Sequence, residues 1–164
     1  MVAIINKLLL KQQRVVLPEG HSTYAQITSG APQGSVLGPL LFLLFINNVV
    51  DLFFGAVNVK LYADDIKIYL EIVDDADIDQ LQMGIDSLSA WADTWQLTLA
   101  VEKTMRLRVG LCKSSPDAQY YLNGSALRTV DEVRDLGIFV DANMCFKAHV
   151  NVIVAEAHLR ANQN

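Results

Sequence analysis

The chain has 164 residues, the size of one domain or of one piece of a larger domain. Hydrophobic residues make up 52% and charged residues 19%, which excludes a disordered chain and supplies enough apolar surface for a core. The formal net charge of -5 has the wrong sign for binding nucleic acid through bulk electrostatics, so any polyanionic partner must be held by a local group of residues.

The first predicted element is a hairpin within residues 13–28, which turns at Pro18-Glu19-Gly20. A loop with the sequence SGAPQGSVLGP follows at residues 29–39, where glycine recurs at every fourth position. This loop is the one part of the chain where proline and glycine are concentrated.

Residues 36–54 are strongly apolar and predict a buried helix. A membrane span is the alternative, but Pro39, Asn47 and Asp51 interrupt the run before it reaches the ~20 residues that a bilayer needs. The N-terminus also lacks the pattern of a secretory signal. We therefore expect an intracellular protein, in the cytoplasm or the nucleus.

Residues 57–72 carry the most informative local pattern. Apolar residues occupy every second position, and the alternation changes parity once, at Asp64-Asp65. If these aspartates form a two-residue hairpin loop, Ala63 faces Ile66 and the apolar residues share one side of the hairpin. The pattern therefore predicts two adjacent carboxylates at the tip of a tight turn.

Acidic residues then mark the start of a long helix. Asp74, Asp75 and Asp77 suit the positive N-terminal end of a helix dipole, and an apolar stripe at spacings of three and four continues to Trp95. Both tryptophans of the chain lie near the end of this helix, where core packing is the expected role.

The remaining patterns predict a strand at 105–109, a hairpin around Asn123-Gly124, a strand at 133–141 and a helix at 145–161. Because helices and hairpins interleave, the expected fold class is α+β. Cys112 and Cys145 show no metal-ligand spacing, so we expect small core residues in a reducing compartment.

Two adjacent aspartates on a turn have two interpretations. The simpler one is an ordinary polar turn, because aspartate is common in turns. The alternative is a divalent metal site, since carboxylate oxygens suit Mg²⁺ and two fixed like charges are costly until a cation neutralises them. Two carboxylates alone are expected to bind Mg²⁺ or Mn²⁺ only weakly, because Mg²⁺ sheds its water reluctantly.

The motif YADD at residues 62–65, after PQGSVLGP at residues 32–39, resembles the palm of a reverse transcriptase of the non-LTR retrotransposon class. The resemblance extends from about residue 13 to residue 157. It includes Trp91-Ala92, Trp95-Gln96-Leu97, Lys103-Thr104, Tyr121-Leu122-Asn123-Gly124 and Asp135-Leu136-Gly137. It implies a palm-like antiparallel sheet backed by helices, with residues 13–141 as palm and 142–164 as the start of a thumb or a terminal helix.

The resemblance also implies roles for individual residues. Asp64 and Asp65 would be catalytic metal ligands for Mg²⁺ or Mn²⁺, and Lys103 would lie near the leaving pyrophosphate. The nucleotide and template pocket would be lined by Pro32, Gln33, Gly34 and Tyr62. The primer grip would contain Leu136 and Gly137, although a plain core strand explains these two residues equally well. The implied partners are an RNA template, a DNA primer and deoxynucleoside triphosphates.

The chain also departs from the family pattern. The family needs a further aspartate before the PQG loop, whereas the only acidic residue before Asp51 is Glu19, in a predicted turn. The basic fingers and nearly all of the thumb have no counterpart in the 164 residues. Ala100 stands where the family usually has asparagine, and Asn48 where it usually has aspartate.

The sequence therefore predicts part of a reverse transcriptase domain that performs RNA-templated DNA synthesis by two-metal nucleotidyl transfer, inactive as an isolated chain. The alternative is a non-enzymatic remnant that binds nucleic acid or a partner chain.

Overall fold

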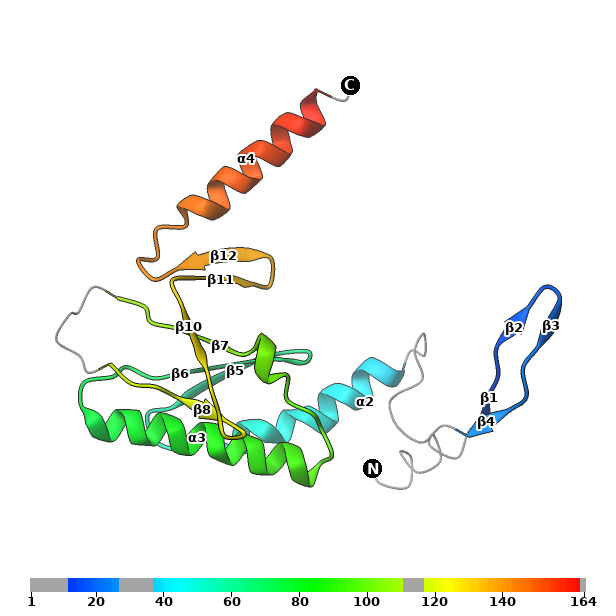
Figure 1. The fold of residues 1–164 in the computed structure, drawn as a ribbon, viewed down its shortest axis with the longest axis horizontal. Helices are drawn as coiled ribbons and strands as arrows, with labels where there is room; N and C mark the ends of the chain where they lie inside the picture. The colour runs from blue at the N-terminus through cyan, green and yellow to red at the C-terminus, as the bar shows by residue number, and fades with distance from the viewer. Residues whose placement is uncertain (1–11, 27–36, 111–116, 163–164) are drawn as a thin grey trace. The chain divides into compact units, whose positions relative to one another are not determined.

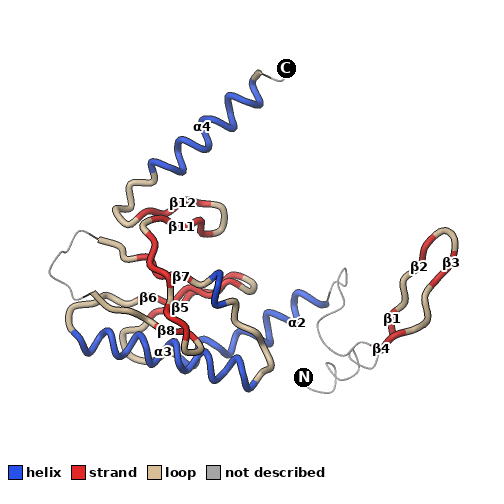
Figure 2. Tube along the Cα trace, viewed as in Figure 1, coloured by secondary structure: helices blue, strands red, loops and turns tan. Residues whose placement is uncertain are grey.

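The computed structural model describes residues 12–26, 37–110 and 117–162 (Figure 1). It divides into two compact units, one of Met1–Val50 and Lys60–Lys67, the other of Asp51–Val59 and Ile68–Asn164. Helices and short strands alternate along the chain, which confirms the predicted α+β class (Figure 2).

The first hairpin lies where the sequence predicts it. Its strands are β1 (Gln12–Gln13), β2 (Val16–Leu17), β3 (Gly20–His21) and β4 (Ala25–Gln26), which pair antiparallel as β1 with β4 and β2 with β3. The turn is made by Pro18 and Glu19, as expected for proline, whose fixed φ suits the first central position of a turn.

Helix α2 (Leu37–Ile46) is the apolar helix predicted after the glycine-rich loop, but its predicted burial is wrong, because Leu40, Leu43 and Leu44 are exposed. At Asn47 it gives way to the 3-10 helix η1 (Asn47–Leu52), so the regular helix is ten residues long, about 15 Å. A bilayer core is about 30 Å thick. Within the part of the chain that the structure describes, no helix has the length and apolar character to cross a membrane.

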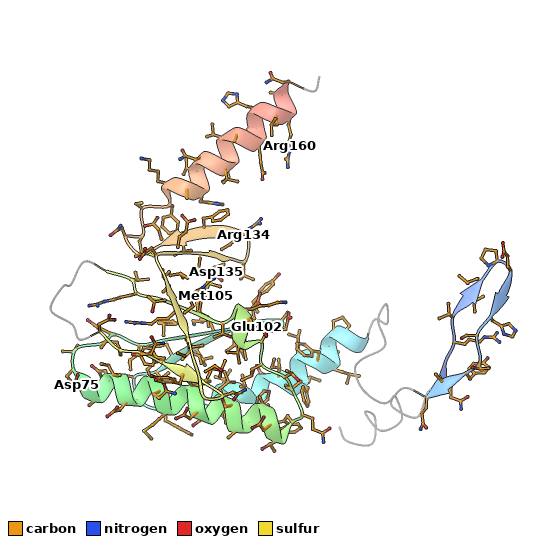
Figure 3. All side chains as sticks on the ribbon, in the orientation of Figure 1. Asp75, Glu102, Met105, Arg134, Asp135 and Arg160 are labelled. Atoms are coloured by element: carbon orange, nitrogen blue, oxygen red, sulfur yellow. The ribbon has the colours of Figure 1, made fainter. Side chains whose placement is uncertain are left out.

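Helix α3 (Asp75–Thr94) begins at the predicted acidic residues (Figure 3). Asp74 is its N-cap and forms a capping box with Asp77: the Asp77 backbone N–H donates to the Asp74 carboxylate, and the Asp74 N–H donates to that of Asp77, both at 3.2 Å. The reciprocal bonds satisfy two backbone donors that a helix start leaves without partners.

The main core of the second unit joins α3 to the hairpin that follows it. Ile85, Tyr120, Leu122 and Leu127 form a buried cluster. The Gln82 side-chain amide also bonds to the backbone of Tyr121 on both sides, accepting from its N–H and donating to its carbonyl, each at 2.9 Å. The amide of Gln82 therefore extends the hydrogen bonding of this hairpin onto the helix.

The remaining elements are η2 (Val101–Lys103), the strands β7 (Met105–Leu107), β8 (Tyr121–Leu122), β9 (Ser125–Ala126), β10 (Arg128–Val130), β11 (Glu132–Asp135) and β12 (Ile138–Asp141), and helix α4 (Lys147–Ala161). The β8–β9 hairpin turns at Asn123 and Gly124, whose φ values of 51° and 74° match the predicted type I′ turn. Among the described residues all strands form two-stranded pairs, and β7 pairs with β10 in parallel, so the expected continuous antiparallel sheet is not seen there.

Helix α4 begins two residues later than predicted because Asp141 holds the preceding residues in a turn. Its carboxylate accepts hydrogen bonds from the backbone N–H groups of Asn143, Cys145 and Phe146. The Cys145 thiol donates to it as well, at 3.1 Å, and this bond is the main cause of the lowered pKa of Asp141. Cys145 is exposed, so its predicted core position is wrong.

Arg106 on β7 forms hydrogen bonds with residues 117 and 118, which precede β8. Its guanidinium donates to the Asp117 carboxylate at 2.8 Å and to the Ala118 carbonyl, and it lies 5.5 Å from the centre of the Tyr120 ring. The hydrogen bond and the positive charge of Arg106 lower the pKa of Asp117. Since Asp117 is exposed, we assign this pair a positioning role rather than a large contribution to stability.

Candidate active site

The YADD residues lie on the hairpin of strands β5 (Asn58–Tyr62) and β6 (Asp65–Tyr69). Tyr62 ends β5, Ala63 and Asp64 form the loop, and Asp65 begins β6. The prediction of a tight turn is confirmed, but the predicted loop of Asp64 and Asp65 is wrong by one residue. The sequence pattern did not reveal this shift because Ala63, an apolar residue, occupies the loop with a φ of 52°.

The exposure of the hairpin alternates with a period of two on both strands. Val59, Leu61, Ile66 and Ile68 are half-buried, while the residues between them are exposed. In a two-residue hairpin the residues that flank the loop face each other, so Leu61 faces Ile66 on the half-buried side. The predicted single apolar face is therefore confirmed, and the opposite face is left to solvent.

Positive φ is uncommon outside glycine and costs roughly 1–2 kcal/mol for an L residue. Positive φ at the first loop position, where Ala63 lies, is the feature of a type II′ turn, which normally has glycine there. Such strained residues cluster at functional sites. The backbone of Ala63 therefore sets the position at which the Asp64 side chain leaves the turn.

We expect Ala63→Val to lower the free energy of unfolding by about 1–2 kcal/mol, because a β-branched side chain fits the left-handed region poorly. Ala63→Gly, which removes the steric penalty, is expected to change it by less than ~1 kcal/mol. Urea denaturation of the three chains measures both values. Equal stability of the valine and glycine variants would contradict the left-handed conformation.

The two carboxylates fit a hard divalent cation in their chemistry. Asp64 and Asp65 are both exposed, and they are adjacent at the tip of a turn. Carboxylate oxygens are the ligands that Mg²⁺ takes in phosphate-transfer sites, where it keeps several waters. Within the described ranges, no group of three or more His, Cys, Asp or Glu residues is placed to hold a metal. The turn therefore offers a partial ligand set of the right type.

Lys103, the predicted pyrophosphate-side residue, is exposed at the end of η2. Its backbone N–H donates to the Ala100 carbonyl at 3.0 Å, as does that of Thr104. Ala100 thus contributes its carbonyl, which any residue at this position would also supply. The side chain of Lys103 extends from a short turn that these bonds hold.

Leu136 and Gly137 form the loop between β11 and β12, directly after Asp135 (Figure 3). Their φ values are 47° and 90°, and Leu136 is 54% exposed. The predicted single strand over residues 133–141 is therefore wrong, and so is the alternative of a core strand for these two residues. Leucine is rare with positive φ, so Gly137 was the turn signal of this loop and Leu136 gave none.

The structure describes only some of the other predicted site residues. Tyr62 is 66% exposed beside the carboxylates. Pro32, Gln33 and Gly34 lie outside the described residues. The structure therefore brings Tyr62, Asp64 and Asp65 together on one turn. Lys103 and the Leu136-Gly137 loop belong to the second unit, on separate elements.

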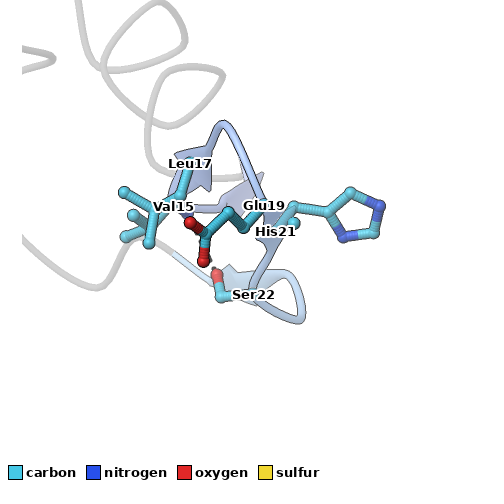
Figure 4. A pocket seen from close by; sticks show the side chains of 6 residues that line it. Val15, Leu17, Glu19, His21 and Ser22 are labelled. Carbon is cyan, nitrogen blue, oxygen red and sulfur yellow. Dashed lines mark hydrogen bonds between the residues drawn. The ribbon is translucent and has the colours of Figure 1, made fainter.

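A pocket on the β2–β3 hairpin is lined by Val15, Leu17, Glu19, Gly20, His21 and Ser22 (Figure 4). The lining residues are exposed. Glu19, the acidic residue that precedes Asp51 in the sequence, lies on the turn of this hairpin.

Sequence reasoning overlooked Lys60 and Lys67. Both are exposed and lie on the same face of the hairpin as Tyr62 and Asp65, two residues farther from the loop. The alternation of residues 57–72 already contained this signal, because it places the lysines at the polar positions.

The family model for reverse transcriptase (RNA-dependent DNA polymerase) matches residues 2–140, which include the whole of this turn. The chain belongs to the reverse transcriptase family. Its expected resemblance to polymerases of non-LTR mobile elements is confirmed by the relatives that follow.

Similar proteins come from insect mobile elements. This reverse transcriptase chain is 32% identical over 140 residues to the RNA-directed DNA polymerase from mobile element jockey of Drosophila funebris, covering 79% of this chain and 15% of that protein. It is 31% identical over 143 residues to the probable RNA-directed DNA polymerase from transposon BS of Drosophila melanogaster, covering 82% and 16%. The chain thus spans about 15% of the length of such curated relatives. No solved structure matches it.

Proposed function

We propose that this chain supplies the metal-binding turn of a polymerase active site and takes part in RNA-templated DNA synthesis. The observation that carries the proposal is the turn itself, where Tyr62, Asp64 and Asp65 lie exposed and adjacent. The substrates are an RNA template, a DNA primer and deoxynucleoside triphosphates. The fold role is that of a palm over residues 13–141, with residues 142–164 as the start of a thumb.

Asp64 and Asp65 would hold Mg²⁺ or Mn²⁺ through their carboxylate oxygens. When bound, a pair of such ions stabilises the attacking and leaving oxygens of an in-line displacement. Asp64 lies in the loop and Asp65 at the first position of β6, so the two exposed carboxylates come from adjacent backbone positions. The two negative charges attract a cation. They repel the phosphates of the substrate until the cation is bound.

The remaining residues position the substrates. Tyr62, together with Pro32, Gln33 and Gly34, lines the nucleotide and template pocket. Lys103 places a positive charge near the leaving pyrophosphate. The exposed loop of Leu136 and Gly137 contacts the primer, and its backbone presents polar groups at the tip of a hairpin. Arg134 stabilises this hairpin from the side, since its guanidinium lies 5.5 Å from the centre of the Phe139 ring opposite.

A chimera tests the proposed function. Residues 12–141 of this chain replace the aligned stretch of the jockey polymerase of Drosophila funebris, and primer extension on an RNA template is measured with Mg²⁺. Asp64→Ala in the chimera is expected to lower extension at least about a thousandfold, because loss of several kcal/mol of transition-state stabilisation has that effect. The control is Glu156→Gln on α4. It is made in a longer chimera that carries residues 12–162 of this chain. Extension that is unchanged by Asp64→Ala would overturn the proposal.

A further inference from the structure

The turn between β12 and α4 is held by the carboxylate of Asp141, the last residue of β12. Its Oδ1 accepts hydrogen bonds from the backbone N–H groups of Asn143 and Cys145, at 2.9 and 3.2 Å. Its Oδ2 accepts from the backbone N–H of Phe146, at 2.9 Å. Phe146 is the N-cap of α4, so the Oδ2 bond joins the end of the strand directly to the start of the helix.

The same turn is anchored to the rest of its compact unit. Ala142 donates its backbone N–H to the Asp131 carbonyl at 2.9 Å, and its own carbonyl accepts from the Gly110 N–H at 3.0 Å. Both partners belong to the second unit, as does α4. The first residue of the turn is therefore fixed, and the bonds of Asp141 extend that fixation to the helix.

Two residues of the turn have a backbone conformation that needs outside support. Met144 and Phe146 have φ values of 55° and 54°, in the left-handed region that is unfavourable for residues with a side chain. Strained backbone of this kind persists only where the surrounding structure over-determines it, and it clusters at functional sites. Asp141 supplies the support, because it accepts bonds from the residues on either side of Met144 and from Phe146 itself.

We propose that Asp141 is a positioning residue that fixes α4 to the β11–β12 hairpin before the primer binds. The inference rests on the proposed function, in which the loop of Leu136 and Gly137 contacts the primer and residues 142–164 begin the thumb. The hairpin carries that loop at one end and Asp141 at the other. A helix that is already fixed loses less conformational freedom on binding, so Asp141 strengthens primer binding without touching the substrate.

Asp141→Asn tests these bonds because a side-chain amide has only one acceptor oxygen. In either orientation its NH₂ group faces a backbone N–H to which the carboxylate was bonded, so the Phe146 bond or the other two are lost. Asp131→Asn is the matched control, since it makes the same charge change on an exposed residue whose carbonyl holds the same turn. Cys145→Ala removes only the thiol bond to Asp141.

Residual dipolar couplings measured by NMR on residues 1–164 report whether α4 and the β11–β12 hairpin share one orientation. In the wild-type chain, in Asp131→Asn and in Cys145→Ala, both elements are expected to fit one common alignment. In Asp141→Asn the α4 couplings are expected to shrink while those of the hairpin and of α3 are retained. Unchanged α4 couplings in Asp141→Asn overturn the inference. So does a collapse of the α3 couplings as well, because Asp141 would then stabilise the whole unit rather than position α4.

The longer chimera, which carries residues 12–162, gives the functional readout. Asp141→Asn is expected to raise KM for the primer–template at least about tenfold, the cost of losing one hydrogen bond to a charged group, with kcat unchanged. Asp131→Asn and Cys145→Ala are expected to change neither constant. A fall in kcat with unchanged KM overturns the inference, as do equal effects of Asp141→Asn and Asp131→Asn.

The two experiments separate this inference from the proposed function. If the chimera is insensitive to Asp64→Ala, the polymerase proposal fails and the primer's part in the inference fails with it, whereas the dipolar couplings still decide whether Asp141 fixes α4. If the chimera responds to Asp64→Ala but Asp141→Asn changes neither the α4 couplings nor KM, the polymerase proposal stands and the positioning role is overturned.

Discussion

Residues 1–164, purified alone, are expected to extend no primer on an RNA template above background in the presence of Mg²⁺. Phosphoryl transfer is catalysed almost entirely by positioning and charge neutralisation, so the carboxylates, a triphosphate clamp and a primer grip must act together. The described residues supply two adjacent carboxylates and no group of three metal-ligating residues. The chimera with the jockey polymerase is the positive control.

Robust extension by the isolated chain, abolished by Asp64→Ala, would contradict this expectation. A further acid would then have to complete the site, and Glu19 is the first to examine, because it lies exposed on a turn of the same compact unit. Glu19→Ala would abolish the extension in that case. A contaminating polymerase is recognised by extension that survives both substitutions.

Leu122→Ala is expected to cost about 2–5 kcal/mol of unfolding free energy, the range for truncating a buried leucine. Leu122 is 3% exposed and lies in the cluster with Ile85, Tyr120 and Leu127. A domain of this size has about 5–15 kcal/mol in total, so the variant loses a large fraction of its stability. The measurement is urea denaturation followed by circular dichroism.

The matched control is Leu159→Ala on α4, where the leucine is 65% exposed. A surface truncation of this kind changes stability by at most about 0.5 kcal/mol. If both alanine variants lose equal stability, the cluster around Leu122 is not the core that stabilises the second unit. A midpoint shift without a change in m-value would identify the loss as one of stability rather than of compactness.

Local sequence patterns correctly predicted the elements for which hydrophobic periodicity, capping residues or turn residues gave a clear signal. The period-two alternation of residues 57–72 gave the hairpin and its buried face. Asp74 and Asp77 marked the start of α3, where they form reciprocal hydrogen bonds. Asn123-Gly124 gave its turn because both residues tolerate positive φ. The motif around Asp64 also led to the family that comparison confirmed.

The incorrect loop predictions share a physical cause. In each case the residue adopts a backbone conformation that is unusual for its type. Ala63 and Leu136 both adopt positive φ in loops, so one loop was placed a residue late and the other was not predicted. The hydrogen bonds that Asp141 accepts from the residues just after it form a local turn, which delays the start of α4.

The parallel pairing of β7 with β10 has a consequence for the order of folding. The β8–β9 hairpin closes a turn between neighbouring residues, whereas Met105 meets Arg128 only after the chain has passed through that whole hairpin. Contacts between distant residues form more slowly because loop closure costs entropy first. Pulse-labelled hydrogen exchange should therefore protect Leu127, whose amide bonds to Tyr120, before Thr129. On this expectation the hairpin forms first and then brings the two parallel strands into register.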